Sequence, residues 1–353
     1  MADLTQALIE QVRDAHASGT TLEIRGAGSK QFMGRSASAD ATIDIAGHRG
    51  IVKYDPVELV LTARAGTPLR EIHSVLDENH QMLAFEPPHF ATGATLGGTL
   101  ACNQSGPARP WGGSVRDAVL GIRLINGRGE YLRFGGQVMK NVAGYDVSRA
   151  QAGAMGTLGV MTEISLKVMP KPVATTTLVQ ELAASDAIVK MNTLAGQPQP
   201  LMGACWQNGK LYLRLAGVNS AVTSTVNRWG GTALDQADDF WESLKEHQQP
   251  FFTTDAPLWR FSVNSSANHW HPEADWIIDW GGAQRWLKGN FDQSQLEQEA
   301  KQAGGQVGLF RGGDRTGEVF ATQAPALQLL HQRLKNAFDP VGIFNPGRLY
   351  SWM

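Results

Sequence analysis

The amino-acid sequence predicts a protein of the α+β class, and three observations carry that prediction. Two strand-like runs, V-L-G-I-R-L-I and Y-L-R-F, flank the turn signal N-G-R-G at residues 126–129, which favours an antiparallel hairpin over a parallel crossover. Helix and strand signals are interleaved with such hairpins along the first half of the chain. Glycine provides 39 of the 353 residues and clusters between Gly93 and Gly159, where a bare backbone can approach a ligand closely.

The first half of the chain contains the elements of one domain, residues 1–170. An amphipathic helix begins near Leu4 and stops at Gly19, and Thr67 and Pro68 predict the cap and first turn of a helix that runs to about Asn79. The other predicted elements are strands over residues 21–25, 41–45, 50–54 and 58–64, a short helix over 96–102, the hairpin, and a strand that ends before residue 170.

Pro170 and Pro172 mark a predicted boundary, after which residues 171–325 predict a smaller α+β domain with a sheet covered by helices. Its predicted strands are 211–215, 259–263 and 275–280, and its predicted helices are 183–194, 219–229, 236–247 and 293–303. Residues 326–353 form a third segment, in which the end of a helix precedes the turn-rich F-D-P-V-G-I-F-N-P-G-R. We expect this terminal segment to pack against another part of the chain.

Composition excludes several classes of function. A net charge of −2 and a pI near 6.5 give no basic face for nucleic acid. Two cysteines, Cys102 and Cys205, are too few for a disulfide scaffold or a metal cluster, so the chain is expected in a reducing, cytoplasmic compartment. The N-terminus does not resemble a signal peptide, and no run is apolar enough for a membrane helix, so membrane contact is expected only through partner proteins.

The loop R-G-A-G-S-K, residues 25–30, follows a predicted strand and has small residues that expose backbone N–H groups, as a phosphate site requires. It matches neither the P-loop, because Ser29 and not glycine precedes Lys30, nor the Rossmann fingerprint, because residue 31 is Gln. An ordinary strand-to-loop turn explains the six residues equally well. A second phosphate-compatible segment is A-T-L-G-G-T-L-A-C-N-Q-S-G, whose short helix has its N-terminal N–H groups toward the preceding loop.

Six motifs in order resemble the vanillyl-alcohol-oxidase, or PCMH-type, family of FAD-binding flavoproteins. They are R-G-A-G-S-K, A-T-L-G-G-T-L-A-C-N-Q-S-G, G-S-V-R-D-A-V-L-G, G-Y-D, G-T-L-G-V-M-T-E and the terminal F-D-P-V-G-I-F-N-P-G-R. Within the family, P-W-G-G-S-V-R-D and V-M-K-N-V-A-G-Y-D resemble the FAD-binding subunits of bacterial glycolate oxidases. The resemblance implies a PCMH-type FAD domain of two subdomains, a cap domain over residues 171–325, and a C-terminal segment that returns to the FAD domain.

The resemblance also implies which residues contact FAD. The loop at residues 25–30 would wrap the pyrophosphate, and a second group would line the pyrophosphate, ribityl and adenosine portions, with Gly156, Gly159 and Val160 along a ring edge. The implied cofactor-binding residues are Arg25, Gly26, Ala27, Gly28, Ser29, Lys30, Thr95, Gly97, Gly98, Asn103, Gly106, Ser114, Asp117, Gly156, Gly159 and Val160. Some members attach FAD through a histidine at the position of Ser29, and a serine cannot form that bond, so we expect non-covalent FAD. Asp117 and Gly159 have a purely structural alternative, a turn held by a side-chain hydrogen bond and a residue with positive φ.

No catalytic residue is identified from the sequence. Related hydroxy-acid dehydrogenases have a histidine-rich G-D-G-N signature in the cap, and the most similar string here, G-G-D-R-T-G at residues 312–317, lacks the asparagine and the histidines. His269 and His271 have no third ligand at a recognisable spacing, so no metal site is expected. His89 lies near the expected flavin site but is a candidate for packing, and Trp276, Trp280 and Trp286 are expected to be core or interface anchors.

The function that the resemblance implies is the FAD-binding subunit of a multi-subunit glycolate (2-hydroxy acid) dehydrogenase. Its partners would be a second FAD-containing catalytic subunit and an iron–sulfur subunit, which would pass electrons to quinone at the inner face of the plasma membrane. Two alternatives remain. The chain is a self-sufficient FAD-dependent hydroxy-acid dehydrogenase, or it is a non-catalytic structural partner that has lost its ligand.

Overall fold

A computed structural model describes residues 3–136 and 146–353, which form two compact units. Unit 1 consists of the described residues of Met1–Gln104, Ser114–Pro170 and Arg315–Met353, and unit 2 consists of Ser105–Gly113 and Lys171–Asp314. Most of the motif V-M-K-N-V-A-G-Y-D, residues 138–145, lies outside the described residues. Sheets and helices occur in both units, which confirms the predicted α+β class.

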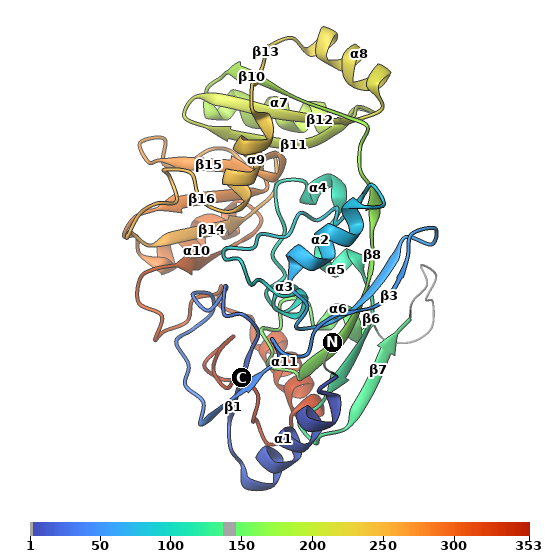
Figure 1. The fold of residues 1–353 in the computed structure, drawn as a ribbon. Helices are drawn as coiled ribbons and strands as arrows, with labels where there is room; N and C mark the ends of the chain where they lie inside the picture. The colour runs from blue at the N-terminus through green and yellow to red at the C-terminus, as the bar shows by residue number, and fades with distance from the viewer. Residues whose placement is uncertain (1–2, 137–145) are drawn as a thin grey trace. The chain divides into compact units, whose positions relative to one another are not determined.

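Unit 1 is built on a five-stranded antiparallel sheet in the order β3-β4-β8-β6-β7 (Figure 1). Its strands are β3 (Ile51–Asp55), β4 (Val60–Arg64), β6 (Val119–Ile125), β7 (Tyr131–Gly135) and β8 (Val160–Lys167). Two smaller pairs are the parallel β1 (Leu22–Arg25) with β2 (Ala41–Asp44), and the antiparallel β5 (Gln81–Met82) with β9 (Met169–Pro170). The predicted hairpin around N-G-R-G is the β6–β7 pair.

The first four helices of unit 1 bury apolar faces in one core with the five-stranded sheet, whereas the buried residues of the last two are Ser148 and Lys335. In chain order the helices are α1 (Thr5–Ser18), α2 (Leu69–Asp77), α3 (Leu96–Cys102), α5 (Val115–Ala118), α6 (Val147–Ala150) and α11 (Pro325–Phe338). α1 ends at Gly19, whose φ of 73° is the left-handed conformation that glycine adopts without strain. The prediction that Thr67 caps α2 is wrong: Pro68 is the cap residue, and the Thr67 hydroxyl instead bonds the backbone N and O of Gly50, at 2.9 and 3.2 Å.

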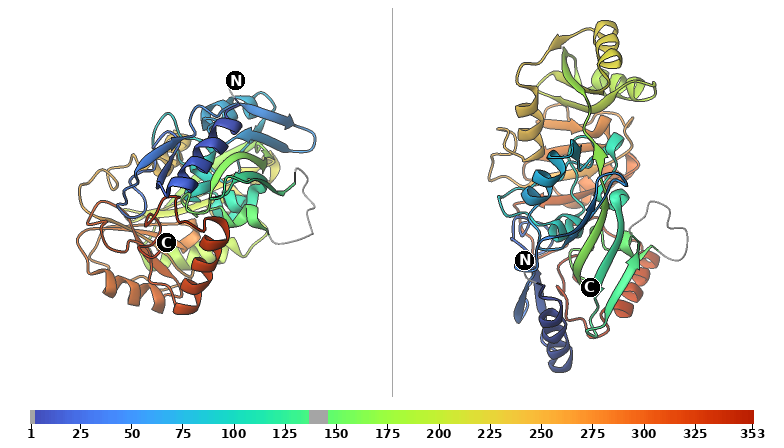
Figure 2. Two further views of the ribbon diagram at one scale, coloured as in Figure 1. Left: turned by 90° about the horizontal axis from the view of Figure 1, so that it is seen from below. Right: turned by 45° about the vertical axis from the view of Figure 1, so that its right-hand side comes forward.

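The C-terminal segment is fastened within unit 1 by a buried ion pair. Lys335 of α11 donates to the Asp339 carboxylate at 2.7 Å and to the carbonyls of Thr157 and Phe344, each at 2.8 Å. The Asp339 carboxylate accepts from the amides of Gly342, Ile343 and Phe344. Ring contact between Phe338 and Phe134 places the end of α11 beside β7 (Figure 2, right, red helix). Each polar group of the pair is hydrogen-bonded, which offsets its desolvation.

Unit 2 contains an eight-stranded antiparallel sheet in the order β13-β10-β12-β11-β15-β16-β14-β17. Its strands are β10 (Ala174–Glu181), β11 (Leu201–Gln207), β12 (Lys210–Gly217), β13 (Thr232–Ala233), β14 (Leu258–Ser262), β15 (Trp276–Asp279), β16 (Gln284–Lys288) and β17 (Gln306–Arg311). Its helices are α4 (Arg109–Gly112), α7 (Ala184–Ala195), α8 (Asn219–Trp229), α9 (Ala237–Lys245), the 3-10 turn η1 (Trp280–Gly282) and α10 (Gln293–Gln302). The sequence did not predict β10, β11, β13, β16 and β17.

The compact units differ from the predicted domain division in two places. Residues 105–113 group with unit 2, because α4 packs on β11 and η1 and the Gly106 carbonyl accepts from the Trp280 indole N–H at 2.9 Å. The return to unit 1 begins at Arg315 rather than at residue 326, because Arg315 Nε donates to the Gly34 carbonyl at 2.7 Å and its own carbonyl accepts from the Ser36 amide.

Candidate functional site

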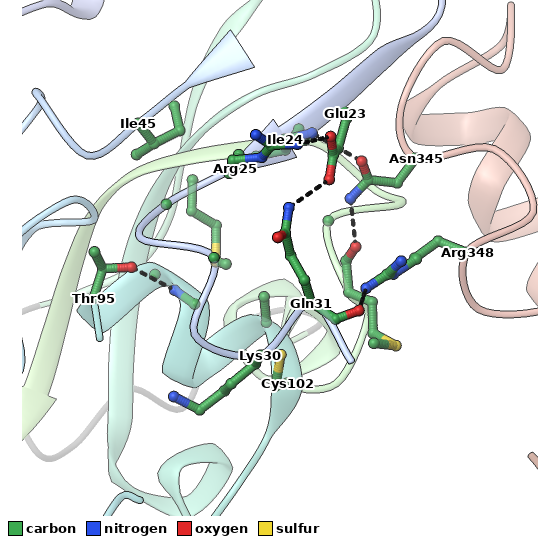
Figure 3. A pocket seen from close by; sticks show the side chains of 18 of the residues that line it. Glu23, Ile24, Arg25, Lys30, Gln31, Ile45, Thr95, Cys102, Asn345 and Arg348 are labelled. Carbon is green, nitrogen blue, oxygen red and sulfur yellow. Dashed lines mark hydrogen bonds and ion pairs between the residues drawn. The ribbon is translucent and has the colours of Figure 1, made fainter. Parts of the chain in front are cut away.

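A cavity in unit 1 brings together three segments that are far apart in the sequence: the loop after β1, helix α3 with its approach, and the C-terminal turn (Figure 3). Its lining contains eleven of the sixteen residues predicted to contact a cofactor: Arg25, Gly26, Ala27, Gly28, Ser29, Lys30, Thr95, Gly97, Gly98, Gly156 and Gly159. Residues that the sequence did not single out complete the wall, among them Gln31, Ile45, Cys102, Met155, Asn345 and Arg348.

The loop after β1 presents a row of unpaired backbone donors to this cavity. Within the described part of the chain, the amide N–H groups of Gly26, Ala27, Gly28 and Ser29 donate to no acceptor. These four residues are half-buried or exposed, and consecutive backbone N–H groups without protein acceptors in a concave wall are the form of an anion site. The loop therefore fits a bound pyrophosphate better than an ordinary turn.

Two glycines are required by the close packing around this loop. A Cβ on Gly26 would lie 2.6 Å from Thr95 Oγ1, and a Cβ on Gly97 would lie 2.9 Å from the Ala65 Cβ and 3.0 Å from its carbonyl oxygen. The loop therefore lies against the cap residue of α3, and α3 lies against the residue that follows β4, at distances that leave no room for a Cβ. Thr95 also caps α3 by accepting from the Gly98 amide at 3.2 Å.

The N-terminus of α3 does not supply the donors that the sequence suggested, and that expectation is corrected. The amides of Leu96 and Gly97 donate to the carbonyls of Thr67 and Ala65, at 3.0 and 2.7 Å, and the Gly98 amide is taken by Thr95. The amides of Leu96 and Gly97 are thus already paired with the turn before α2 and do not donate to an anion. The donors toward an anion lie in the loop at residues 26–29.

The charged residues that line the cavity are three cations, Arg25, Lys30 and Arg348, and one carboxylate, Glu23, which pairs with Arg25 at 2.6 Å. Lys30 is 7% exposed, and its Nζ lies 3.5 Å from the His89 carbonyl oxygen and 5.7 Å from the Phe90 ring centroid. This excess of positive charge matches the two negative charges of a pyrophosphate.

Cys102 lies beside Lys30 in the cavity wall (Figure 3). Burial raises the pKa of its thiol, although Lys30 and Arg348 act in the opposite direction. Cys102 is therefore a neutral, apolar part of the wall at neutral pH.

Asn345 joins two walls of the cavity. Its side-chain oxygen accepts from the Ile24 amide at 2.8 Å, and its side-chain nitrogen donates to the Met155 carbonyl at 2.6 Å (Figure 3). Arg348 fastens the loop from the same turn by donating to the Gln31 carbonyl at 2.5 Å. The motif F-N-P-G-R could have indicated this turn in the sequence, since asparagine tolerates a left-handed conformation. In the structure Asn345 has a φ of 40°.

Five predicted residues do not line the cavity: Asn103, Gly106, Ser114, Asp117 and Val160. Asn103 ends α3 in a left-handed conformation, and its Oδ1 has no hydrogen-bond partner within the described residues. Gly106 belongs to unit 2, and Val160 is fully buried at the start of β8. Ser114 and Asp117 form a capping box at α5, where Asp117 accepts from the Ser114 amide at 2.9 Å and hydroxyl at 2.7 Å.

The candidate histidines form no metal centre. His271 lies between Glu273 and Glu299, at 3.2 and 3.1 Å, and His269 packs against Trp206 and Trp276. Across residues 3–136 and 146–353, no group of three or more His, Cys, Asp or Glu side chains could hold a metal ion. No helix in that part of the chain is both long and apolar enough to cross a membrane.

Comparisons with known proteins agree with this site. Residues 2–135 match the family model described as FAD binding domain. Glycolate oxidase subunit GlcE of Escherichia coli is 47% identical over 349 residues, which cover 99% of this chain and 98% of that protein. Glycolate oxidase subunit GlcD of Bacillus subtilis is 29% identical over 164 residues, 46% of this chain and 35% of that protein. A solved alkyldihydroxyacetonephosphate synthase shares the fold, with a TM-score of 0.64 and 16% identity over 97% of this chain and 75% of its own.

The cavity, its donor loop and the matched domain define an FAD-binding protein of the PCMH-type oxidoreductase class, with FAD as the cofactor. Within that class the similarity extends over nearly the whole length of both chains. The protein belongs to the family of glycolate oxidase subunit GlcE.

Proposed function

We propose that this chain is the FAD-binding subunit of a multi-subunit dehydrogenase that oxidises glycolate, or a closely related 2-hydroxy acid, to the 2-oxo acid. The observation that carries the proposal is the loop at residues 26–29, whose unpaired amides line a cavity with Lys30 and Arg348. FAD held there would supply a two-electron acceptor for the hydride of the substrate's alcohol carbon, and the hydroxyl proton would pass to a base that the sequence does not identify. The sixteen residues named above are the proposed cofactor contacts, with the eleven in the cavity lining as the better supported group.

We further propose that FAD is held without a covalent bond and that electrons leave through an iron–sulfur partner toward quinone. Ser29 has a hydroxyl where a histidyl link would need an imidazole. Cys102 and Cys205 are the only cysteines of the chain, so an iron–sulfur cluster would belong to another subunit. Contact with a membrane would then come from partner subunits.

The first experiment is a visible spectrum of the purified chain before and after acid precipitation. We expect a yellow protein that releases FAD into the supernatant. Colour that stays on the precipitated polypeptide would contradict non-covalent binding, and a colourless chain that also fails to bind added FAD would favour the structural-partner alternative.

Anaerobic addition of glycolate separates the remaining two interpretations. If the flavin of the isolated chain loses its absorbance, the chain is a self-sufficient dehydrogenase. If bleaching requires the partner subunits, the subunit assignment stands.

A further inference from the structure

Unit 2 contains a group of buried polar side chains on one face of its eight-stranded sheet. In the strand register Ser262 of β14 pairs with Gln284 of β16, and Gln284 pairs with Asp279 of β15. Paired residues share a face, and Arg260 lies two residues before Ser262 on that same face. Gln284 and Asp279 are 4% and 3% exposed. Burial of polar groups in a sheet is costly unless hydrogen bonds satisfy them.

Hydrogen bonds join three of these side chains in a row. Arg260 Nε donates to Gln284 Oε1 at 2.7 Å, and Gln284 Nε2 lies 3.5 Å from Asp279 Oδ2. The row fixes the amide orientation of Gln284 and, through it, the plane of the guanidinium. The terminal nitrogens of Arg260, Nη1 and Nη2, donate to no acceptor in the described parts of the chain.

Tryptophan rings hold this guanidinium in place. The Arg260 guanidinium carbon lies 5.0 Å from the Trp280 ring centroid and 5.8 Å from that of Trp286. Arg109 stacks on the same Trp280 ring at 4.5 Å. Burial, with the charge of Arg109, lowers the pKa of Arg260 to about 10, so Arg260 remains protonated at neutral pH. Two cations are therefore held around one indole.

Arg285 of β16 has a purely structural role in the same sheet and can be compared with Arg260. Its three nitrogens donate to the carbonyls of Gly282, Asn268 and Ala267, and it stacks on Trp270 at 4.7 Å. Arg260 has the same kind of stacking, but the outer edge of its guanidinium has no protein acceptor. That edge presents two parallel N–H donors, which match the two oxygens of a carboxylate.

We propose that Arg260 binds the carboxylate of a small 2-hydroxy acid through a bidentate ion pair, with Arg109 as a second positive charge. Gln284 and Asp279 are positioning residues that orient the guanidinium. The identity of the ligand rests on the proposed function, whereas the carboxylate site rests on the geometry of unit 2.

The test is titration of the full, FAD-loaded chain with glycolate without an electron acceptor, followed by tryptophan fluorescence and calorimetry. Arg260→Gln should weaken glycolate binding roughly 10-fold or more, the size expected for loss of a charged hydrogen-bond pair, and Arg260→Lys should weaken it less. Glycolamide, which lacks the charge, should not compete. The matched control is Arg214→Gln, which removes an arginine of the same sheet stacked on Trp241 at 4.8 Å and should leave the affinity unchanged.

FAD content, measured by spectrum on each sample, separates the two proposals. Glycolate that binds Arg260→Gln as tightly as the unaltered chain, or that fails to bind the unaltered chain, overturns the carboxylate site. Binding that depends on Arg260 in a chain that takes up no FAD would support this site and overturn the proposed function. Should Arg260→Gln fold poorly by circular dichroism, the Arg260→Lys and glycolamide arms decide the question.

Discussion

The two candidate sites of this chain offer different groups to a ligand, backbone amides in unit 1 and side chains in unit 2. The cavity of unit 1 uses backbone: unpaired amides of residues 26–29 and glycines that let segments approach closely. The polar face of unit 2 uses side chains, in which Arg260 is oriented by Gln284 and stacked on Trp280. A backbone site depends mainly on how closely its segments pack, whereas a side-chain site depends on the functional group of single residues. Variants should therefore act through backbone packing in unit 1 and through single functional groups in unit 2.

The largest effect should come from a residue of unit 1 that is outside the cavity wall. Lys335→Met leaves the Asp339 carboxylate buried without its cation, and loss of one partner of a buried pair costs about 3–5 kcal/mol. We expect a corresponding loss in the free energy of unfolding by urea, and a lower FAD content because the turn with Asn345 and Arg348 loosens.

Lys301→Met is the matched control, since Lys301 is an exposed lysine in the last turn of α10. Equal stability of the two variants would show that the ion pair does not fasten the C-terminal segment.

The next effect tests the backbone nature of the cavity directly. Gly26→Ala places a Cβ 2.6 Å from Thr95 Oγ1, so either the loop or the cap of α3 must move. Since loss of an N-cap costs about 1 kcal/mol and the amides also lose their alignment, we expect roughly 10-fold to 30-fold weaker FAD binding by fluorescence titration. Gly317→Ala has no atom within 4 Å of its new Cβ and should bind FAD normally.

A double variant sharpens this result. Adding Thr95→Ala removes both the obstructing hydroxyl and the cap of α3, so the double variant should lose less affinity than the two single variants together. Losses that simply add would mean that the contact with Thr95 is not the cause.

A side chain also contributes to the cavity of unit 1, and its effect should be smaller. Lys30→Gln removes a buried cation from the cavity wall and should weaken FAD binding about 10-fold, the size of one charge-assisted hydrogen bond. The difference from the unaltered chain should shrink as salt is raised. Lys30→Arg should keep most of the affinity, and equal loss in both variants would argue for packing against Phe90 rather than for charge.

The difference between backbone and side-chain sites also explains what the sequence could predict. The loop at residues 25–30 and helix α3 were found because glycine leaves a recognisable pattern where backbone must come close. Asn345 and Arg348 were missed as site residues, because their contacts reach across more than 300 positions to Ile24 and Gln31. Arg260 was missed because a single polar residue in a strand has no local signature, and its partner Gln284 lies on β16, a strand that was itself not predicted.

The smallest expected effect is on the pH dependence of stability, to which a buried histidine of unit 1 and one of unit 2 both contribute. His48 is fully buried, its Nδ1 accepts from the Leu4 amide at 3.0 Å, and burial lowers its pKa below the usual 6.5, with Asp3 acting to raise it and Arg64 to lower it. The unfolded chain therefore binds a proton first, so His48 should contribute stability that is complete above pH 6.5 and is lost as pH falls below that value. Asp3, whose pKa is lowered to about 2, would act only in stronger acid.

His48→Gln keeps an oxygen that can accept from the Leu4 amide but removes the titration, so we expect a flatter dependence of Tm on pH between about 7.5 and 5, with a change of a few degrees. Burial also lowers the pKa of His247 in unit 2, and this residue should keep a residual acid slope in the variant. The His48→Gln, His247→Gln double variant would remove both contributions. If the single variant retains the full slope, the acid sensitivity of the chain does not come from His48.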